Sequence, residues 1–118
     1  MHELSIADAI VRIACAHSGG RRIETVEVKV GHLRQVVPDA LAFAFTLVAE
    51  GTDAEGAVLQ MQEIPAAGIC RACGFESEWS GFPLACAACG GLDVELVRGE
   101  ELLVDALTME GVPSGRSR

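Results

Sequence analysis

Two short cysteine motifs constrain the fold of this chain more than any other feature of its sequence. Each motif is a pair of cysteines separated by two residues and followed by glycine, and twelve residues lie between the two pairs of cysteines. They are Cys70-Arg71-Ala72-Cys73-Gly74 and Cys86-Ala87-Ala88-Cys89-Gly90. Two intervening residues let a turn bring both thiolates to one ion, and a glycine with positive φ turns backbone N–H groups toward the sulfurs. The spacing therefore predicts a tetrahedral four-cysteine site.

Four thiolates at tetrahedral corners favour Zn²⁺, with each sulfur about 2.3 Å from the ion. Iron in a rubredoxin-like site is the main competing metal, and two redox-active dithiols are the main competing chemistry. We predict structural Zn(II) on Cys70, Cys73, Cys86 and Cys89. A closed site of four protein ligands leaves no open position for a substrate, so the ion would fold the surrounding segment and would not catalyse.

Four large apolar side chains lie between the two motifs. They are Phe75, Trp79, Phe82 and Leu84. Side chains in such positions normally pack around the ion, and we expect them to do so here; a hydrophobic patch that faces a partner is the alternative. The fifth cysteine, Cys15, stands alone and is most simply a small buried hydrophobic residue.

Size and charge limit what the rest of the chain can do. Its 118 residues correspond to about one domain with one modest core. Its formal net charge of −8 and its single lysine, Lys29, argue against binding to nucleic acid or an anionic membrane. The longest nearly apolar run, 40–49, is about half the ~20 residues of a membrane-spanning helix. The first residues lack a signal-peptide pattern, so we expect a cytoplasmic protein.

Hydrophobic periodicity predicts two helices and a small sheet. The first helix starts at Ser5, because Ser5 and Asp8 fit a capping box, and this leaves Met1–Leu4 as a short arm. Gly19-Gly20 ends it. The second helix starts near Pro38 and ends at Gly51. Strands are expected at 25–30, 57–64, 94–97 and 101–108.

These elements indicate the α+β class, with two helices packed on one face of a small sheet. We expect 1–66 and 98–110 to form one α/β domain. Residues 67–97 are expected to form a projecting four-cysteine, zinc-ribbon-like module inserted between strands, and 111–118 to be a disordered tail.

His2, directly after Met1, offers a second set of metal ligands. The α-amine, the backbone nitrogen of His2 and its imidazole Nδ1 can close fused chelate rings on one ion, and the backbone nitrogen of Glu3 can take a fourth position. An all-nitrogen set suits square-planar Ni²⁺ or Cu²⁺. Binding would displace amide protons, so the affinity should rise with pH. From these residues alone, an exposed histidine without a ligand role is the simpler interpretation.

Taken together, motifs along the chain resemble the HypA/HybF family. They are Met1-His2-Glu3-Leu4-Ser5, the strand that ends at Gly31, Pro38-Asp39-Ala40-Leu41-x-Phe43-Ala44-Phe45, Gly51-Thr52-x-x-Glu55-Gly56-Ala57, the two cysteine motifs and Gly99-x-Glu101-Leu102. The resemblance runs from residue 1 to about residue 110, in the same order and spacing. The second cysteine motif has Ala87 where family members often carry proline, and His32 and Arg34 lie in a loop that varies.

Members of this family are nickel metallochaperones of [NiFe]-hydrogenase maturation. The resemblance implies that Met1, His2 and Glu3 form the nickel site, so that 1–66 and 98–110 are a nickel-binding domain with Ni(II) as transferred cargo. It also implies that the four cysteines hold structural Zn(II). The implied partners are the HypB GTPase, the [NiFe]-hydrogenase large subunit precursor and, in some organisms, urease maturation proteins. We expect a monomer or a weak homodimer.

Several polar residues keep more than one possible role. Glu3 offers its backbone nitrogen to nickel, which we favour, or its carboxylate to His2 or a partner. Asp39 is expected to match the dipole at a helix start, with an extra oxygen ligand as the alternative. His17 falls on the apolar face of the first helix and is expected to pack there. His32 is expected to be an exposed loop histidine, with a metal-ligand role as the alternative.

Three functions remain open on the sequence. The first is a nickel chaperone, the second a zinc-ribbon adaptor without a transition-metal cargo, and the third a thiol oxidoreductase that uses one cysteine pair. Stoichiometric zinc that resists mild oxidation would exclude the third, and nickel binding that needs a free N-terminus would separate the first from the second. The sequence has no glycine-rich phosphate loop and no Ser/His/Asp set, so we expect no enzyme activity.

Overall fold

The computed structural model describes residues 2–111, so the predicted tail at 112–118 lies outside the described residues. The elements are α1 (His2–His17), β1 (Ile23–Gly31), the short 3₁₀ helix η1 (His32–Arg34), α2 (Pro38–Ala49), β2 (Val58–Ile64), β3 (Ala66–Cys70), β4 (Glu76–Trp79), β5 (Val94–Arg98) and β6 (Leu102–Met109). These helices and small sheets confirm the predicted α+β class. Within the described residues, no helix is both long enough and apolar enough to cross a membrane.

The chain forms two compact units. The first, here called the helical unit, contains the described residues of Met1–Lys29, Val36–Gln62 and Leu103–Arg118. The second, here called the cysteine unit, contains Val30–Gln35 and Glu63–Leu102. Each unit has its own sheet: one has the strand order β2-β1-β6, and the other has the order β4-β3-β5.

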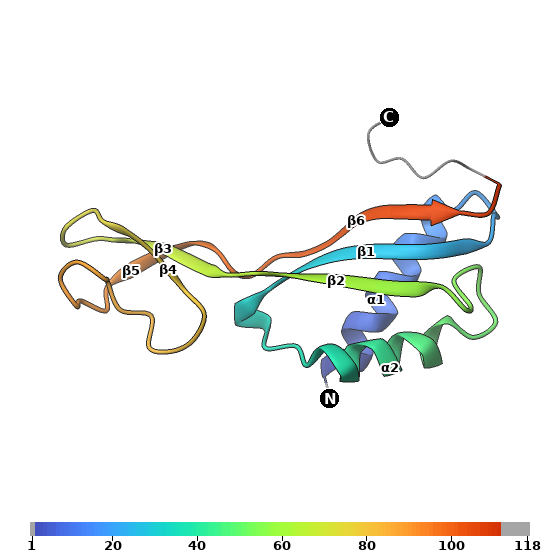
Figure 1. The fold of residues 1–118 in the computed structure, drawn as a ribbon, viewed down its shortest axis with the longest axis horizontal. Helices are drawn as coiled ribbons and strands as arrows, with labels where there is room; N and C mark the ends of the chain where they lie inside the picture. The colour runs from blue at the N-terminus through green and yellow to red at the C-terminus, as the bar shows by residue number, and fades with distance from the viewer. Residues whose placement is uncertain (1, 112–118) are drawn as a thin grey trace. The chain divides into compact units, whose positions relative to one another are not determined.

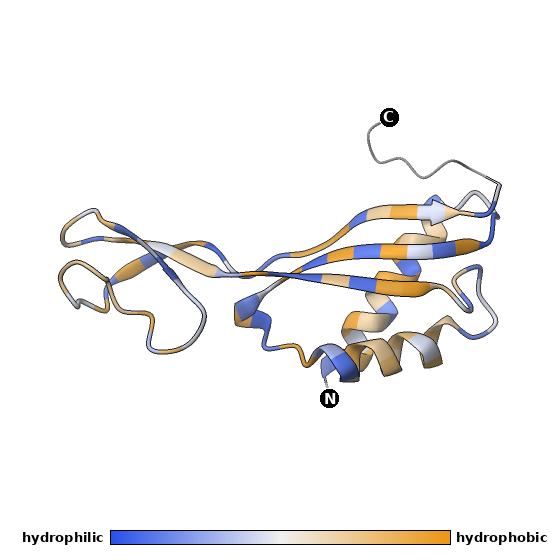
Figure 2. Cartoon of the chain, in the orientation of Figure 1, coloured by the Kyte–Doolittle hydropathy of each residue, from blue (hydrophilic) through white to orange (hydrophobic). Residues whose placement is uncertain are grey.

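The helical unit contains the main hydrophobic core. In β1 the valines at 26 and 28 are buried and alternate with more exposed residues, which Figure 2 shows as alternating orange and blue bands. Helix α1 lies behind the sheet in Figure 1, and α2 packs against α1. The largest buried side chains here include Phe45, Leu41 and Ile10. The apolar faces that the periodicity predicted therefore meet in one core.

Helix α1 begins earlier than the sequence predicted. The predicted arm at Met1–Leu4 and the start at Ser5 are wrong, because the helix already includes His2. The Ser5 hydroxyl donates to the carbonyl of His2 at 3.0 Å and does not cap a helix start. The N-terminal residues are therefore part of a helical turn.

The cysteine unit has a sheet with few buried apolar side chains. The central strand β3 pairs antiparallel with β4, from Ala66 opposite Trp79 to Ile69 opposite Glu76. It pairs antiparallel with β5 on its other side, with a register shift at Ala67. The sequence predicted β5 but missed β3 and β4, which are short and lack a strong alternating pattern.

Two glycines allow the backbone to pass closely within the cysteine unit. A β-carbon at Gly31 would overlap the carbonyl carbon and oxygen of Gly99. The same Gly99 oxygen accepts the N–H of Leu33 at 2.8 Å, and the Gly31 N–H donates to Glu101 at 2.7 Å. Because backbone atoms on both sides are fixed by hydrogen bonds, position 31 requires glycine.

Replacing Gly31 should destabilise the protein strongly. We expect Gly31→Ala to lower the free energy of unfolding by about 3 kcal/mol, because the new methyl group forces the backbone at Gly99 to shift. Urea denaturation of the zinc-loaded protein measures the change. Gly81→Ala is the matched control, since a β-carbon there meets no heavy atom within 4 Å. Equal denaturation midpoints for the two variants would contradict this account of position 31.

Candidate metal centre

The four predicted cysteines come together in one cluster. Their sulfurs all lie within 4.8 Å of one another. The Sγ atoms of Cys70 and Cys89 are 3.7 Å apart, and those of Cys73 and Cys86 are 3.5 Å apart. In a regular tetrahedron with metal–sulfur bonds of about 2.3 Å, the sulfurs are about 3.8 Å apart. The cluster therefore fits one tetrahedral Zn²⁺, and among residues 2–111 no other His, Cys, Asp or Glu group of this kind occurs.

The two cysteine motifs have the same backbone conformation. The Gly74 N–H donates to the carbonyl of Cys70 at 2.8 Å, and the Gly90 N–H donates to that of Cys86 at 2.8 Å. Both glycines have positive φ, 79° and 78°. The sequence prediction that these glycines adopt the left-handed region is confirmed. The first cysteine of each motif is buried and the second is exposed.

Backbone N–H groups stabilise the thiolate of each buried cysteine. The N–H of Cys73 and then that of Ala72 lower the pKa of Cys70. The N–H of Cys89, 3.5 Å from the Cys86 sulfur, lowers the pKa of Cys86 to about 6. Metals bind thiolate and not thiol, so these two sulfurs are prepared to bind a cation.

The second cysteine of each motif, Cys73 or Cys89, has a raised pKa. The Phe75 N–H lowers the pKa of Cys73, but the Cys86 sulfur, burial and the other two sulfurs together outweigh it and raise that pKa to about 12. For Cys89 the Gly91 N–H acts in the lowering direction, and the Cys70 sulfur raises the pKa. Without a cation the protein therefore retains protons in the cluster. A divalent ion would displace them, because metals bind thiolates and not thiols.

The residues between the motifs do not all surround the cluster. Trp79 lies over Gly68 and donates its indole N–H to the carbonyl of Ala85 at 2.7 Å. The buried Ser77 hydroxyl accepts the N–H of Ala87 at 3.0 Å and so ties the second motif to β4. The expectation that Phe75 and Phe82 pack around the ion is wrong, since their exposed fractions are 48% and 61%.

Of the predicted nickel ligands, Met1 lies outside the described residues, and His2 and Glu3 are the first two residues of helix α1. The His2 side chain is half exposed, and its Nδ1 lies 3.8 Å from a Glu3 carboxylate oxygen. Glu3 is buried, and its carboxylate accepts the N–H of Val37 at 3.1 Å. The Glu3 side chain therefore joins the start of α1 to the residue before α2. The local sequence pattern could not predict this contact, because Glu3 and Val37 are 34 positions apart.

The other two histidines, His17 and His32, contact residues other than the proposed nickel ligands. The prediction that His17 packs in the core is wrong: it is exposed, and its Nδ1 donates to the carbonyl of Ile13 at 2.9 Å. His32 is only partly exposed, and its Nδ1 lies 3.0 Å from a carboxylate oxygen of Glu63. Asp39 lies in the first turn of α2, as the dipole argument predicted.

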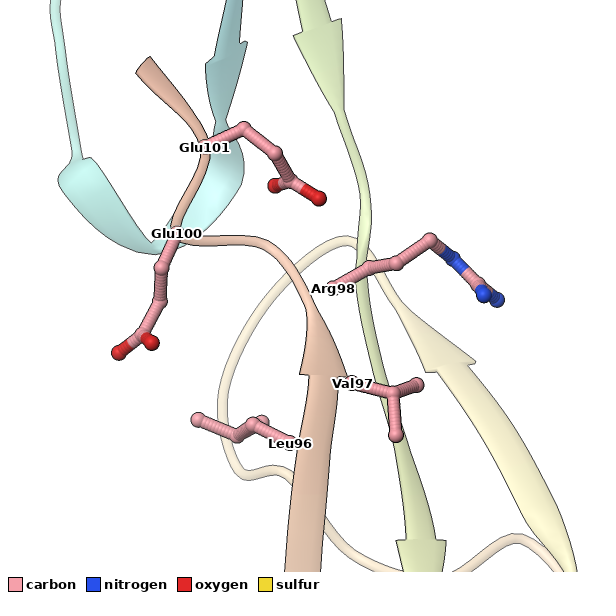
Figure 3. A pocket seen from close by; sticks show the side chains of 5 residues that line it. All are labelled: Leu96, Val97, Arg98, Glu100 and Glu101. Atoms are coloured by element: carbon pink, nitrogen blue, oxygen red, sulfur yellow. The ribbon is translucent and has the colours of Figure 1, made fainter.

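One hollow of the cysteine unit lies at the end of β5. It measures about 270 Å³ and is lined by Leu96, Val97, Arg98, Glu100 and Glu101. Figure 3 shows that the carboxylates of Glu100 and Glu101 point in different directions. Arg98 donates to the Glu76 carboxylate at 2.9 Å. The hollow therefore presents no converging set of metal ligands.

Comparison with known proteins places these observations in a family. A family model described as "Hydrogenase/urease nickel incorporation, metallochaperone, hypA" matches residues 1–109. A hydrogenase maturation factor HypA from Geotalea uraniireducens is 41% identical over 110 residues, which are 93% of this chain and 100% of the relative. The HypA of Geobacter metallireducens is also 41% identical, with the same coverage of both chains.

The fold also matches a solved structure. The solution structure of the nickel metallochaperone HypA from Helicobacter pylori aligns with a TM-score of 0.66 and 22% sequence identity. The alignment covers 92% of this chain and 97% of the other. At this identity the likeness concerns the fold alone.

Removing one cysteine of the cluster should remove its metal. We expect Cys86→Ser to bind no stoichiometric zinc and to lose the folded cysteine unit, because three thiolates and few buried apolar side chains remain. Metal analysis and near-ultraviolet circular dichroism measure both effects. Cys15→Ser is the matched control and should retain one zinc per chain. Loss of zinc from Cys15→Ser, or its full retention in Cys86→Ser, would contradict the assignment.

Proposed function

This chain belongs to the HypA family, and we propose that it is a nickel metallochaperone that binds Ni(II) at its N-terminus and delivers it for [NiFe]-hydrogenase maturation. The observation that carries the proposal is the family match, which begins at residue 1 and so includes His2. The proposed ligands are the amine of Met1, the backbone nitrogen and Nδ1 of His2, and the backbone nitrogen of Glu3. Nitrogen donors of this kind suit square-planar Ni²⁺. The His2 backbone nitrogen closes a chelate ring with each of the other three donors but has only two adjacent positions in a plane, so the Met1 amine and the Glu3 nitrogen compete for one of them.

The position of these residues in helix α1 supports the proposal. The first four N–H groups of an α-helix have no partner within the helix. The amide nitrogens of His2 and Glu3 lie in this first turn, because α1 begins at His2. Deprotonating them for nickel leaves the i→i−4 hydrogen bonds of the following turns in place.

Planar binding through both amides requires a local change in the backbone. A flat chelate ring needs the N–Cα–C–N torsion of His2 to be nearly eclipsed, whereas helical residues have ψ near about −42°. The first turn of α1 would therefore unwind at His2 when nickel binds. An ion held at a terminal turn can leave by stepwise ligand exchange with a recipient, and protonation of the ligands favours its release.

The remaining assignments follow from family membership. We propose structural Zn(II) on the four cysteines, and the HypB GTPase and the [NiFe]-hydrogenase large subunit precursor as partners in the cytoplasm. Urease maturation proteins are a further proposed partner class. We retain the proposed division into a nickel-binding domain, 1–66 with 98–110, and a zinc module, 67–97. No catalytic residue is proposed.

A specific observation favours a second candidate function. Phe75 and Phe82 are exposed in the cysteine unit, with exposed fractions of 48% and 61%. Exposed aromatic side chains are common at protein interfaces. A zinc-ribbon adaptor without nickel is therefore the alternative, and nickel binding decides between the two.

Nickel binding should depend on His2 and on a free N-terminus. We expect zinc-loaded protein to bind one Ni²⁺ per chain, and His2→Ala and a variant with one added N-terminal residue each to lose this binding. The loss follows because each change removes a ligand or displaces the amine from its chelate ring. Isothermal calorimetry measures the affinity, and a visible absorption band of diamagnetic nickel identifies planar coordination.

His17→Ala is the matched control, because it removes an exposed histidine from the same helix. It should bind nickel as the unmodified chain does. If all four proteins bind nickel equally, or if none does, the N-terminal site is wrong and the adaptor becomes the leading candidate.

Glu3→Gln separates the two roles left open for Glu3. The amide oxygen of Gln can still accept the Val37 N–H, and the backbone nitrogen is unchanged. We therefore expect the nickel affinity to change by less than about threefold, which corresponds to less than about 0.7 kcal/mol. Calorimetry on the folded, zinc-loaded variant measures it. A loss of about a hundredfold or more would instead make the carboxylate a ligand.

A further inference from the structure

Strand β6 forms an outer edge of the sheet in the helical unit. It is hydrogen-bonded to β1 on one side, and in the described part of the chain no strand pairs with its other side. Figure 1 shows β6 along the rim of this sheet. Native edge strands are usually shortened or protected by lysine, proline or a bulge, because free N–H and C=O groups attract other strands. Strand β6 has eight residues and contains neither lysine nor proline.

A groove runs beside this edge, between β6 and helix α1. It measures about 270 Å³ and is lined by Ile13, His17, Val104, Asp105, Ala106 and Leu107. Ile13 has an exposed fraction of 42%, although it lies beside the core face of α1. The small residues Ala9 and Ala16 line a second hollow on α1 together with Ile13, His17 and Arg12, whose guanidinium donates to the Asp8 carboxylate at 3.0 Å. The groove is therefore shallow, largely apolar and open to solvent.

An edge strand beside a helix-walled groove suits one kind of ligand, an extended polypeptide. Its backbone can pair with the edge, and its alternate side chains can enter the groove. A compact small molecule or a helix would use the groove but not the backbone groups of the edge. The occupant is therefore an extended protein segment with an apolar residue at every second position.

The charge of β6 and of the whole chain indicates which side chains the partner segment carries between its apolar residues. The sequence from Leu102 to Glu110 contains two carboxylates, Asp105 and Glu110, and no basic residue. Lys29 lies 3.9 Å from Asp105, and Arg21 donates to the carbonyl of Glu110 at 3.4 Å, so each offsets part of this charge. The whole chain carries a net charge of −8, which disfavours a second copy of the same acidic strand. A basic segment is favoured.

We infer that β6 and the groove beside it bind an extended segment of a partner protein, with alternating apolar and basic residues, as a fourth strand of this sheet. The inference goes beyond the proposed nickel transfer and uses none of the proposed nickel or zinc ligands. It assigns a docking surface to the helical unit through which a partner can be held while the N-terminal turn remains accessible.

A designed peptide tests this surface directly. The probe is an acetylated and amidated heptapeptide in which Lys and Val alternate, titrated into the isotope-labelled, zinc-loaded full chain. We expect saturable NMR shift changes and slowed amide exchange in β6, with no comparable changes in β2. N-methylation of the Val amides or of the Lys amides blocks opposite edges of the peptide, because alternate N–H groups point to opposite sides of a strand. One of these two methylated peptides should therefore lose binding and the other should retain it.

Paired variants test the groove. Ile13→Arg places a bulky cation in the groove and should weaken peptide binding by at least about tenfold. Leu47→Arg is the matched control, because Leu47 is also a helical residue and is exposed to 47%, close to the 42% of Ile13. It should bind the peptide as the unmodified chain does. Zinc content and the NMR spectrum show whether both variants are folded.

Several results would overturn the inference. They are no saturable binding of the unmethylated peptide, shift changes outside β6 and the groove, equal binding of both methylated peptides, and equal binding by Ile13→Arg and Leu47→Arg. A concentration-dependent dimer with protected β6 amides in the absence of peptide would make a second copy the occupant and would also overturn it. Because the nickel ligands are not involved, these outcomes do not depend on whether nickel binding at His2 succeeds or fails.

Discussion

The convergence of four sulfurs is the feature on which the cysteine unit depends, and we propose that one Zn²⁺ holds them together. The buried apolar side chains of this unit include Ala66 and Ala67, which are too small to form a core of useful size. By contrast, the helical unit buries Phe45, Leu41 and Ile10. We therefore propose that the energy of metal binding replaces hydrophobic burial in the cysteine unit, as it does in other small zinc-dependent folds. This also explains why aromatic residues between the motifs remain exposed without loss of the fold.

The two metal sites of this account differ in how they hold an ion. The four-cysteine site is closed, its ligands come from two loops, and backbone N–H groups stabilise the buried thiolates of Cys70 and Cys86. The proposed nickel site lies at the first turn of α1, outside the i→i−4 hydrogen bonds of the rest of the helix. A closed site of soft ligands is suited to retaining its ion. A site at a chain terminus, where a helical turn unwinds when the ion binds, is suited to passing the ion to a recipient. Glu3 connects the proposed nickel site to the start of α2, because its carboxylate accepts the N–H of Val37.

Features encoded over a few residues were predictable from the sequence, and features that depend on distant contacts were not. The cysteine motifs predicted both the cluster and the positive φ of Gly74 and Gly90, since spacing and glycine decide such turns locally. The start of α1 was misplaced because Ser5 matched a capping pattern, while the contact that fixes the true start joins Glu3 to Val37, 34 residues away. Strands β3 and β4 form through pairing with each other and with β5, so their own short sequences carry little signal.

X-ray absorption at both metal edges tests the central claim, that one chain retains zinc on sulfur and carries nickel on nitrogen. The sample is the full chain loaded with one zinc and then one nickel per molecule. The account predicts four sulfur neighbours at about 2.3 Å around zinc. It predicts only light neighbours, nitrogen or oxygen, around nickel. Sulfur scattering at the nickel edge, or a loss of sulfur neighbours from zinc when nickel is added, would contradict the separation of the two sites.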